Sequence, residues 1–302
     1  MSTAAGLSIA SFSPVRLEDR ELIERFFAEN NPQSCEYNFP NLYSWGEAYH
    51  TRWRLFHGRL IIYTGLDDEL LFPLGKPFPD ARELCEISDA FRSQGKSGSI
   101  NQPPSDFLKN YPEIMEDFNL EVNEDAGEYI YLAEKLATLS GSRLAKKKNL
   151  VSQFLRENPD CTCATLTKEL AEPCIALSEK WRGSRTEAVE YLDQEKSAME
   201  RALRNFDMLG VGGLAAFRKG NLLAFAAFSR INSDSCTVHF EKYDPEIKGA
   251  AQYINWELAK ILREKFIYVN REQDLGLPGL RQAKRSYAPI RIQPHISLRR
   301  KD

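Results

Sequence analysis

A run of alternating polar side chains follows a buried strand in the segment YVNREQDLGLPGLRQAKRSYAP, residues 268–289. If the strand continues to Asp274, its side chains alternate between two faces, so Asn270, Glu272 and Asp274 project to one side. Carboxylates in this position could accept a proton from an attacking amine or hydroxyl group, or could anchor the amine itself. We therefore predict that Glu272 and Asp274 are catalytic, and Glu241, on the preceding strand, is the next candidate.

Basic side chains return beside these acids on a helix that begins after the turn at Gly276. Pro278 suits the first position of that helix, because its missing N–H costs nothing there. Arg281 and Lys284 are three residues apart and share one side of the helix, where they could hold a phosphate or carboxylate group. The alternative is a surface ion-pair network that ties the helix to its sheet. We predict instead that the acids and these cations form the floor of a substrate pocket.

A second group of cations lies in SGSRLAKKKNLVSQFLRENP, residues 140–159, which the sequence predicts to be helical. At 100° per residue, its apolar stripe comprises Leu144, Val151, Phe154 and Leu155. Lys147 and Lys148 fall inside this stripe, so they must either extend along apolar surface to reach water or line a cleft that holds an anion. We expect both lysines to point into the cleft between two domains. The residues predicted to bind substrate are Lys147, Lys148, Asn149, Lys242, Asn270, Arg281 and Lys284.

The net charge of −3 conceals a strong asymmetry between the two halves of the chain. Residues 1–140 carry 12 Lys and Arg against 23 Asp and Glu, whereas residues 141–302 carry 28 against 20. A basic second half suggests an anionic partner such as a nucleotide cofactor, RNA or phospholipid. The alternative is that the two halves attract each other.

Several classes of protein are disfavoured by the sequence. The longest apolar run, LLAFAAF, is far shorter than the ~20 residues that span a bilayer. The segment MSTAAGLSIASFSP lacks the features of a secretory signal, so we expect a cytoplasmic protein. The six cysteines form no C-x-x-C pair and the four histidines are scattered, so no metal site is predicted. Serine-hydrolase elbow and Walker A motifs do not occur.

The succession of elements from Cys161 onward predicts the fold of the second half. Hydrophobic patterns indicate strand, helix, helix, three strands, helix, strand, helix and strand, with the hairpin 214–231 central in a mixed sheet. Ser184-Arg-Thr-Glu187 has the S-x-x-E form of a capping box and is expected to open the second helix. This order resembles that of the acetyltransferase (GNAT) fold, whose sheet opens after its fourth strand where the acyl donor binds.

In that fold, the loop after the fourth strand reads Gln/Arg-x-x-Gly-x-Gly/Ala and presents backbone N–H groups to a pyrophosphate. The corresponding stretch here is Glu246-Ile-Lys-Gly249-Ala-Ala251, so the resemblance predicts Gly249 and Ala250 as cofactor-binding residues. The acid at Glu246 would repel the phosphates of coenzyme A, which favours an altered donor.

Several segments resemble the family of the phosphatidylglycerol lysyltransferase C-terminal domain. The match is carried by YVNREQDLGLPGLRQAKRSYAP, HFEKYD, GAAQYIN, RLAKKKNLVSQF and NLYSWGEAY. The resemblance implies an α/β (α+β) fold of two tandem GNAT-like domains, each with a mixed central sheet flanked by helices. We expect the domains at residues 1–145 and 146–302, with the active cleft in the second.

The resemblance also implies transfer of an acyl or aminoacyl group to an amine or hydroxyl. The related peptidoglycan-bridge aminoacyltransferases use aminoacyl-tRNA as donor, and acyl-CoA is the other candidate. Full lysyltransferases carry a membrane portion before this domain, and none is expected here, although peripheral contact with lipid stays open. The alternative function is a non-catalytic module that binds RNA, a nucleotide or a lipid headgroup. The sequence predicts no oligomeric state.

Overall fold

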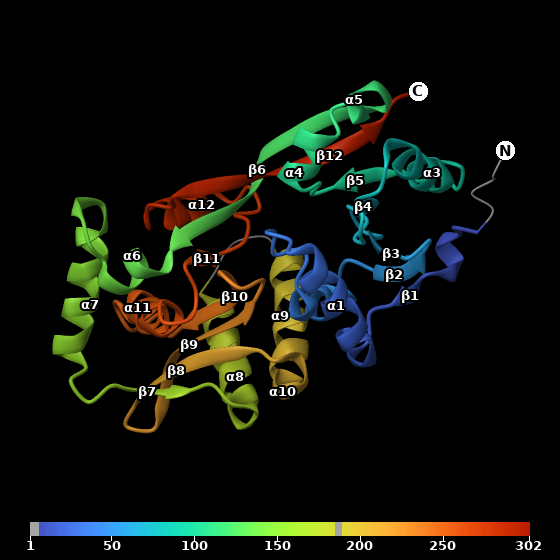
Figure 1. Ribbon diagram of the computed structural model, residues 1–302. Helices are drawn as coiled ribbons and strands as arrows, with labels where there is room; N and C mark the ends of the chain where they lie inside the picture. The colour runs from blue at the N-terminus through green and yellow to red at the C-terminus, as the bar shows by residue number, and fades with distance from the viewer. Residues whose placement is uncertain (1–5, 185–188) are drawn as a thin grey trace. The chain divides into compact units, whose positions relative to one another are not determined.

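The computed structural model describes residues 6–184 and 189–302 (Figure 1). The chain forms two compact units: unit 1 comprises Met1–Glu124 and Pro294–Asp302, and unit 2 comprises Asp125–Gln293. Each unit contains a mixed sheet with helices packed on it, so the predicted α/β class is confirmed. None of the helices in the described ranges is both long enough and apolar enough to cross a bilayer.

The division differs from the expected domains at 1–145 and 146–302. Strand β6 (Phe118–Leu132) carries the chain from unit 1 into unit 2, and β12 (Arg291–Arg300) carries it back. Domain boundaries are usually recognised by an exposed linker rich in Gly, Pro or polar residues. Here the chain crosses within strands, which leave no such mark in the composition.

Unit 1 has the strand order β1-β2-β3-β4-β5-β12-β6. Strands β1 to β4 pair antiparallel, β4 and β5 pair parallel, and β5 pairs antiparallel with β12. Besides parts of β6 and β12, its elements are η1 (Ile9–Ser11), β1 (Ser13–Pro14), η2 (Leu17–Asp19), α1 (Arg20–Asn30), α2 (Phe39–Trp45), β2 (Thr51–Phe56), β3 (Arg59–Thr64), β4 (Glu69–Leu71), α3 (Ala81–Arg92), β5 (Ser99–Asn101), α4 (Ser105–Asn110) and α5 (Ile114–Asp117).

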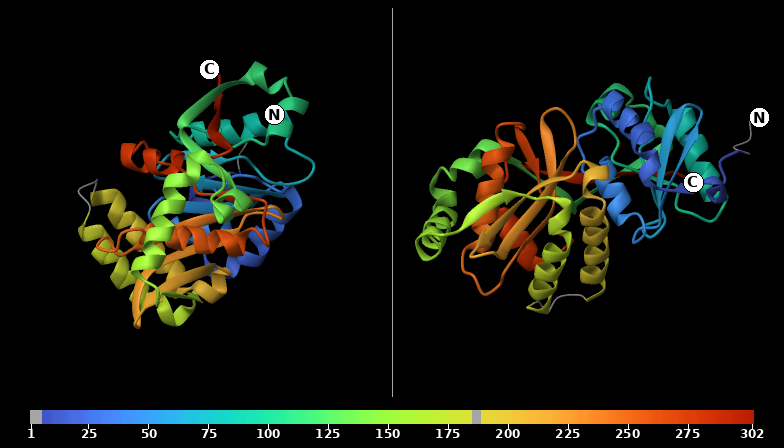
Figure 2. Two further views of the ribbon diagram at one scale, coloured as in Figure 1. Left: turned by 90° about the vertical axis from the view of Figure 1, so that its left-hand side faces the viewer. Right: turned by 90° about the horizontal axis from the view of Figure 1, so that it is seen from below.

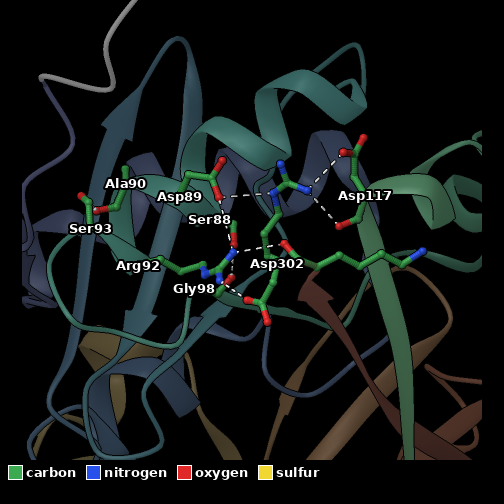
Figure 3. Close-up of polar contacts among 10 residues, drawn as sticks. Ser88, Asp89, Ala90, Arg92, Ser93, Gly98, Asp117 and Asp302 are labelled. Atoms are coloured by element: carbon green, nitrogen blue, oxygen red, sulfur yellow. Dashed lines mark hydrogen bonds and ion pairs between the residues drawn. The ribbon is translucent and has the colours of Figure 1, made fainter.

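The C-terminal residues are tied to unit 1 by ion pairs around α3, which Figure 3 shows in close-up. Arg92 lies 2.6 Å from the Asp302 carboxylate. Arg300 lies 3.2 Å from Asp89 and 3.1 Å from Asp117. Leu298, in the same strand as Arg300, is fully buried in the aromatic core of unit 1. The end of the chain therefore belongs physically to the first unit, although it follows the second in sequence.

Unit 2 has the strand order β6-β11-β10-β9-β8-β7, and all of its pairings are antiparallel except β10 with β11. Its elements are α6 (Ala133–Thr138), η3 (Ser142–Leu144), α7 (Ala145–Glu157), β7 (Thr162–Thr165), η4 (Lys168–Leu170), α8 (Ala171–Gly183), α9 (Val189–Arg204), α10 (Phe206–Leu209), β8 (Gly212–Arg218), β9 (Asn221–Arg230), β10 (Ser235–Tyr243), α11 (Ala250–Leu262), β11 (Tyr268–Asn270) and α12 (Pro278–Arg285).

The predicted succession of elements from Cys161 onward is confirmed, and the hairpin 214–231 lies inside the sheet of unit 2 as β8 and β9. The last strand was expected in the second domain, but β12 belongs to unit 1 from Pro294 onward and pairs there with β5. The capping box expected at Ser184–Glu187 lies, apart from its first residue, outside the described residues.

Helices α6, α7 and α11 share one hydrophobic core with the sheet of unit 2, and α8 packs against β9 and β10 (Figure 2). The stripe predicted for α7 is largely confirmed, because Leu144, Val151 and Phe154 are buried. Leu155 is a correction, since 40% of it is exposed. It lies at the edge of the stripe, where the exposed side of the helix begins.

Candidate functional site

Strands β10 and β11 begin as a parallel pair and then separate. Their pairing runs from Ser235 with Tyr268 to Thr237 with Asn270, whereas β10 continues to Tyr243. After Asn270 the chain stays with β6, because Arg271 N–H donates to the Tyr129 carbonyl at 2.9 Å. We call this point, where the parallel strands part, the strand split. Side chains from both strands cross it.

On the face toward α11, the split is bridged by Arg271 and Glu241. Arg271 Nη2 lies 3.1 Å from Glu241 Oε2, and Asn255 Nδ2 on α11 donates to the same oxygen at 3.0 Å. Burial alone would lower the pKa of Arg271, but the Glu241 carboxylate acting together with Tyr131 and Tyr287 outweighs burial and raises this pKa. Among the described residues, Arg271 Nη1 and Asn255 Oδ1 are buried and have no hydrogen-bond partner. The bridge therefore leaves one donor, Arg271 Nη1, and one acceptor, Asn255 Oδ1, able to bond to another group.

Two aromatic rings lie near the Arg271 guanidinium, and a second cation lies against one of them. The Arg271 Cζ atom lies 4.9 Å from the ring centre of Tyr287 and 5.9 Å from that of Tyr131. Lys147 Nζ lies 4.4 Å from the centre of the same Tyr287 ring. An aromatic face attracts cations, so Tyr287 holds two positive groups near a single carboxylate. This end of the split carries an excess of positive charge.

Lys147 and Lys148 are not brought together, although the sequence predicted that both belong to the site. Lys147 is half-buried, and burial, reinforced by the charge of Arg271, lowers its pKa. Lys148 and Asn149 are exposed on α7. They lie one and two residues further round the helix, so the turn that buries Lys147 directs them toward solvent. For Lys148, placement inside the apolar stripe was wrong.

The alternating ladder predicted for Asn270, Glu272 and Asp274 is not extended strand. Strand β11 ends at Asn270, and Glu272 has a left-handed backbone with φ of 56°. The Asn270 side chain accepts the Glu272 N–H at 2.8 Å, a local turn of the kind that Asn favours. Asn270 also donates to the buried carboxylate of Glu128. This correction reflects side-chain-to-backbone bonding, which a pattern of alternation does not predict.

Glu272 faces β10 rather than Asp274. Its Oε1 atom accepts hydrogen bonds from Thr237 Oγ1 at 3.0 Å and from His239 Nδ1 at 3.0 Å. Two bridges therefore cross the split, Arg271 with Glu241 and Glu272 with His239. Arg271 supplies the cation of the first bridge, and the next residue, Glu272, supplies the anion of the second.

The remaining members of the predicted pocket hold the loop itself. Asp274 is buried and receives bonds from Arg281 at 2.8 and 3.0 Å and from Tyr129 Oη at 2.7 Å. Burial opposes its ionisation, but hydrogen bonds from Arg281, Tyr129 and Gly276 N–H outweigh burial and lower its pKa to about 2. Lys284 Nζ donates to the carbonyls of Arg271, at 2.6 Å, and Gln273. These contacts fix the loop 270–276 in one conformation.

Lys242 lies on β10 among the side chains of α8 and α9. Only 4% of its side chain is exposed, and Nζ lies 2.8 Å from each carboxylate oxygen of Glu195. The ammonium also sits 3.7 Å from the ring centre of Trp181. A lysine satisfied in this way has its charge neutralised within unit 2, which differs from the predicted contact with substrate.

The start of α11, predicted to receive a cofactor, is packed against α7. Gly249 and Ala250 are both buried, and Gly249 has φ of 83°. A Cβ at Gly249 would lie 2.8 Å from the Leu150 carbonyl oxygen and 3.0 Å from Phe154 Cβ. The glycine therefore serves the close approach of two helices, and a carbonyl oxygen, which repels anions, lies against this helix start.

The contacts at the split involve several residues that the sequence did not single out, and four of them show what signal, if any, was available. Arg271 and Tyr287 lie in the quoted C-terminal segment, and Asn255 and His239 lie on α11 and β10. Asn255 occupies a position where α11 turns its buried side to the sheet, so a polar residue inside that apolar stripe was the available signal. For His239 the sequence offered no such signal, because its position depends on an irregularity in the strand pairing.

A family of known proteins matches most of the chain. The family model described as phosphatidylglycerol lysyltransferase, C-terminal, matches residues 27–298. An uncharacterised protein from Mycoplasmoides gallisepticum is 23% identical over 173 residues, which are 56% of this chain. The match spans about half, 54%, of that relative's length.

Solved structures extend the comparison. A conserved protein of unknown function from Bacteroides thetaiotaomicron is 29% identical, with a TM-score of 0.87 over 96% of this chain and 99% of that chain. The C-terminal domain of an assigned lysylphosphatidylglycerol synthetase from Agrobacterium fabrum is 12% identical, with a TM-score of 0.62 over 94% and 93%. FemX is 7% identical, with a TM-score of 0.59 over 95% and 96%. At these last two identities the likeness concerns the fold alone.

Proposed function

We propose that this chain transfers an acyl or aminoacyl group to an amine or hydroxyl at the strand split. The premise is that the chain belongs to the phosphatidylglycerol lysyltransferase C-terminal family. The observation that carries the proposal is the pair of cations at Tyr287. Lys147 and Arg271 share this ring near one carboxylate, Glu241, and Arg271 Nη1 has no partner among the described residues. This arrangement suits a carbonyl oxygen that gains negative charge during transfer.

The reaction needs three things: a positioned carbonyl, a base for the proton of the acceptor, and donors for the oxyanion. Arg271, assisted by Lys147, is the proposed donor to the oxyanion. Glu272 is the proposed base. The acceptor nitrogen or oxygen bonds to the carbonyl carbon as its proton moves to Glu272, and the bond to the leaving oxygen or sulfur of the donor then breaks.

We propose an aminoacyl ester of tRNA as the donor, in preference to acyl-CoA. The buried start of α11 supports this choice, because Gly249 abuts the Leu150 carbonyl oxygen where the resemblance placed a pyrophosphate. The acceptor is proposed only as a class, an amine or a hydroxyl, carried either on a lipid headgroup or on a small molecule.

The experiment compares transfer of radiolabel from a pool of aminoacyl-tRNAs and from acetyl-CoA. Acceptors are supplied as phosphatidylglycerol vesicles and as a mixture of small amines and alcohols. We expect label to move from aminoacyl-tRNA, and we expect Lys147→Gln to slow this transfer about tenfold or more, since it removes one charge from the oxyanion site.

Lys148→Gln is the matched control, because it removes the same charge from the next, exposed position of α7. Equal effects of the two substitutions would remove Lys147 from the site. Salt-sensitive binding of tRNA without transfer to any acceptor would instead favour the binding-module alternative.

A further inference from the structure

Three side chains on the α8 side of the split form a continuous hydrogen-bonded chain. Ser229 Oγ on β9 lies 2.8 Å from His239 Nε2 on β10. His239 Nδ1 lies 3.0 Å from Glu272 Oε1, and Thr237 Oγ1 donates to the same oxygen at 3.0 Å. A hydroxyl, an imidazole and a carboxylate in this order are the groups of a nucleophile, base and orienting acid.

The carboxylate determines where the imidazole carries its proton. An ionised carboxylate only accepts hydrogen bonds, so His239 Nδ1 must donate to Glu272. In the neutral ring Nε2 is then an acceptor, and the Ser229 hydroxyl donates to it. The chain of bonds therefore runs in one direction, from Ser229 through His239 to Glu272.

A bulge in β10 aims the imidazole at the split. Val238 pairs with Phe228 and Phe240 pairs with Ala227, so His239 is the extra residue between two consecutive partners. An extra residue of this kind bends a strand and redirects a side chain. The bulge places His239 between Ser229 on its own sheet and Glu272 beyond the split.

Burial decides which end of the chain can meet a substrate. Ser229 is only 4% exposed and the His239 side chain only 3%, whereas 17% of the Glu272 side chain is exposed. Both side-chain bonds of Glu272 end on Oε1, and within the described residues Oε2 has no hydrogen-bond partner. A hydrolase that attacks through serine needs its hydroxyl at the surface. Here the accessible group is the carboxylate.

The backbone of Glu272 is held as firmly as its side chain. Its N–H donates to Asn270 Oδ1 at 2.8 Å, and its carbonyl accepts from Tyr129 N–H at 3.2 Å. A left-handed conformation at a residue other than glycine persists where its surroundings impose it, and such positions gather at functional sites. These contacts hold Glu272 in place and leave Oε2 available to a substrate.

We propose that Ser229 and His239 are positioning residues that present Glu272 Oε2 as the base for the acceptor. This inference rests on the proposed transfer function. The acceptor N–H or O–H proton moves to Oε2 while the acceptor atom bonds to the carbonyl carbon, and the proton then passes to the departing group. His239 keeps its proton throughout and fixes the carboxylate by its Nδ1–H bond.

The first experiment needs no substrate and reads the imidazole directly. Nitrogen NMR of histidine-labelled protein, with the His239 signals identified by their loss in His239→Asn, should show the Nδ1–H tautomer with Nε2 as acceptor. Glu272→Gln should weaken that preference, because the amide no longer demands a donor. An Nε2–H tautomer of His239 in the unmodified protein would overturn the inference.

A pair of substitutions at His239 separates its two bonds. Asn places its amide nitrogen close to the Nδ1 position, so His239→Asn can keep the bond to Glu272. Gln reaches the Nε2 position, so His239→Gln can keep the bond to Ser229 and loses the one to Glu272. In the transfer assay with aminoacyl-tRNA, we expect kcat to fall about 100-fold in His239→Gln and only severalfold in His239→Asn, with KM unchanged in both.

Equal losses in the two variants would refute positioning through Nδ1. Labelling of Ser229 by a fluorophosphonate would also refute it, because the chain would then run toward a serine nucleophile. If the unmodified protein transfers nothing from any donor, the proposed function fails, and the tautomer measurement still decides the geometry on which the inference stands.

Discussion

Substituting alanine for Gly249 tests how closely α7 packs against the start of α11. The residue has φ of 83°, a conformation that costs a residue with a Cβ about 1–2 kcal/mol. The new Cβ would lie 2.8 Å from the Leu150 carbonyl oxygen and 3.0 Å from Phe154 Cβ. Overpacking of this kind costs about 1–3 kcal/mol more, because the carbonyl is helix backbone and not the end of a flexible side chain. Together the free energy of unfolding should fall by about 2–5 kcal/mol.

Gly220→Ala is the matched control for this substitution. Gly220 lies in the turn between β8 and β9 with φ of 80°, and no atom lies within 4 Å of the place that a Cβ would occupy there. It should therefore cost only the backbone term, about 1–2 kcal/mol. Urea unfolding followed by tryptophan fluorescence gives the difference between the two variants. If the two variants lose the same free energy of unfolding, α7 does not press on the start of α11. The prediction of a phosphate site at Gly249 would then stand again.

Two further predictions concern buried charges in unit 2. The pKa of Asp274 is lowered from 3.8 to about 2, so its carboxylate stabilises the fold fully above pH 3.8 and loses that contribution, about 2 kcal/mol, as the pH falls toward 2. The urea midpoint should therefore depend less on pH across this range in Asp274→Asn than in the unmodified protein. An unchanged dependence would contradict the assignment. Glu195→Gln leaves Lys242 buried without its carboxylate and should cost about 3–5 kcal/mol in the same unfolding assay. Glu246→Gln, which breaks the exposed pair with Lys180, should cost no more than about 1 kcal/mol, and equal costs would refute the distinction.

The order of elements in unit 2 could be predicted because it is set by local pattern. Short apolar runs in the strands and apolar stripes in the helices match the succession of elements from β7 to β12. Pro278 begins α12, as its fixed backbone and missing N–H predict. Such features depend on residues close in sequence, and no tertiary contact overrides them here.

The candidate site was less predictable, because long-range contacts decide what each charged side chain meets. Lys242 was expected to face a substrate, but Glu195, distant in sequence, meets it first. Lys148 follows Lys147 directly, and one step of the helix separates a half-buried amine from an exposed one. Glu272 leaves the extended conformation because Asn270 bonds its N–H. Charge and periodicity singled out this loop and left the partners of its side chains undetermined.

The segment that carries the family resemblance divides into residues that hold the loop and residues that face the split. Asp274 and Arg281 bind each other, and Lys284 binds loop carbonyls, so these three account for the shape of residues 270–276. That shape turns Arg271 toward Glu241 and Glu272 toward His239. A relative that kept the first three residues and replaced the others would share the fold and lose the proposed chemistry. Activity in this family should therefore follow the side chains that cross the split, because the signature itself specifies only the loop that presents them.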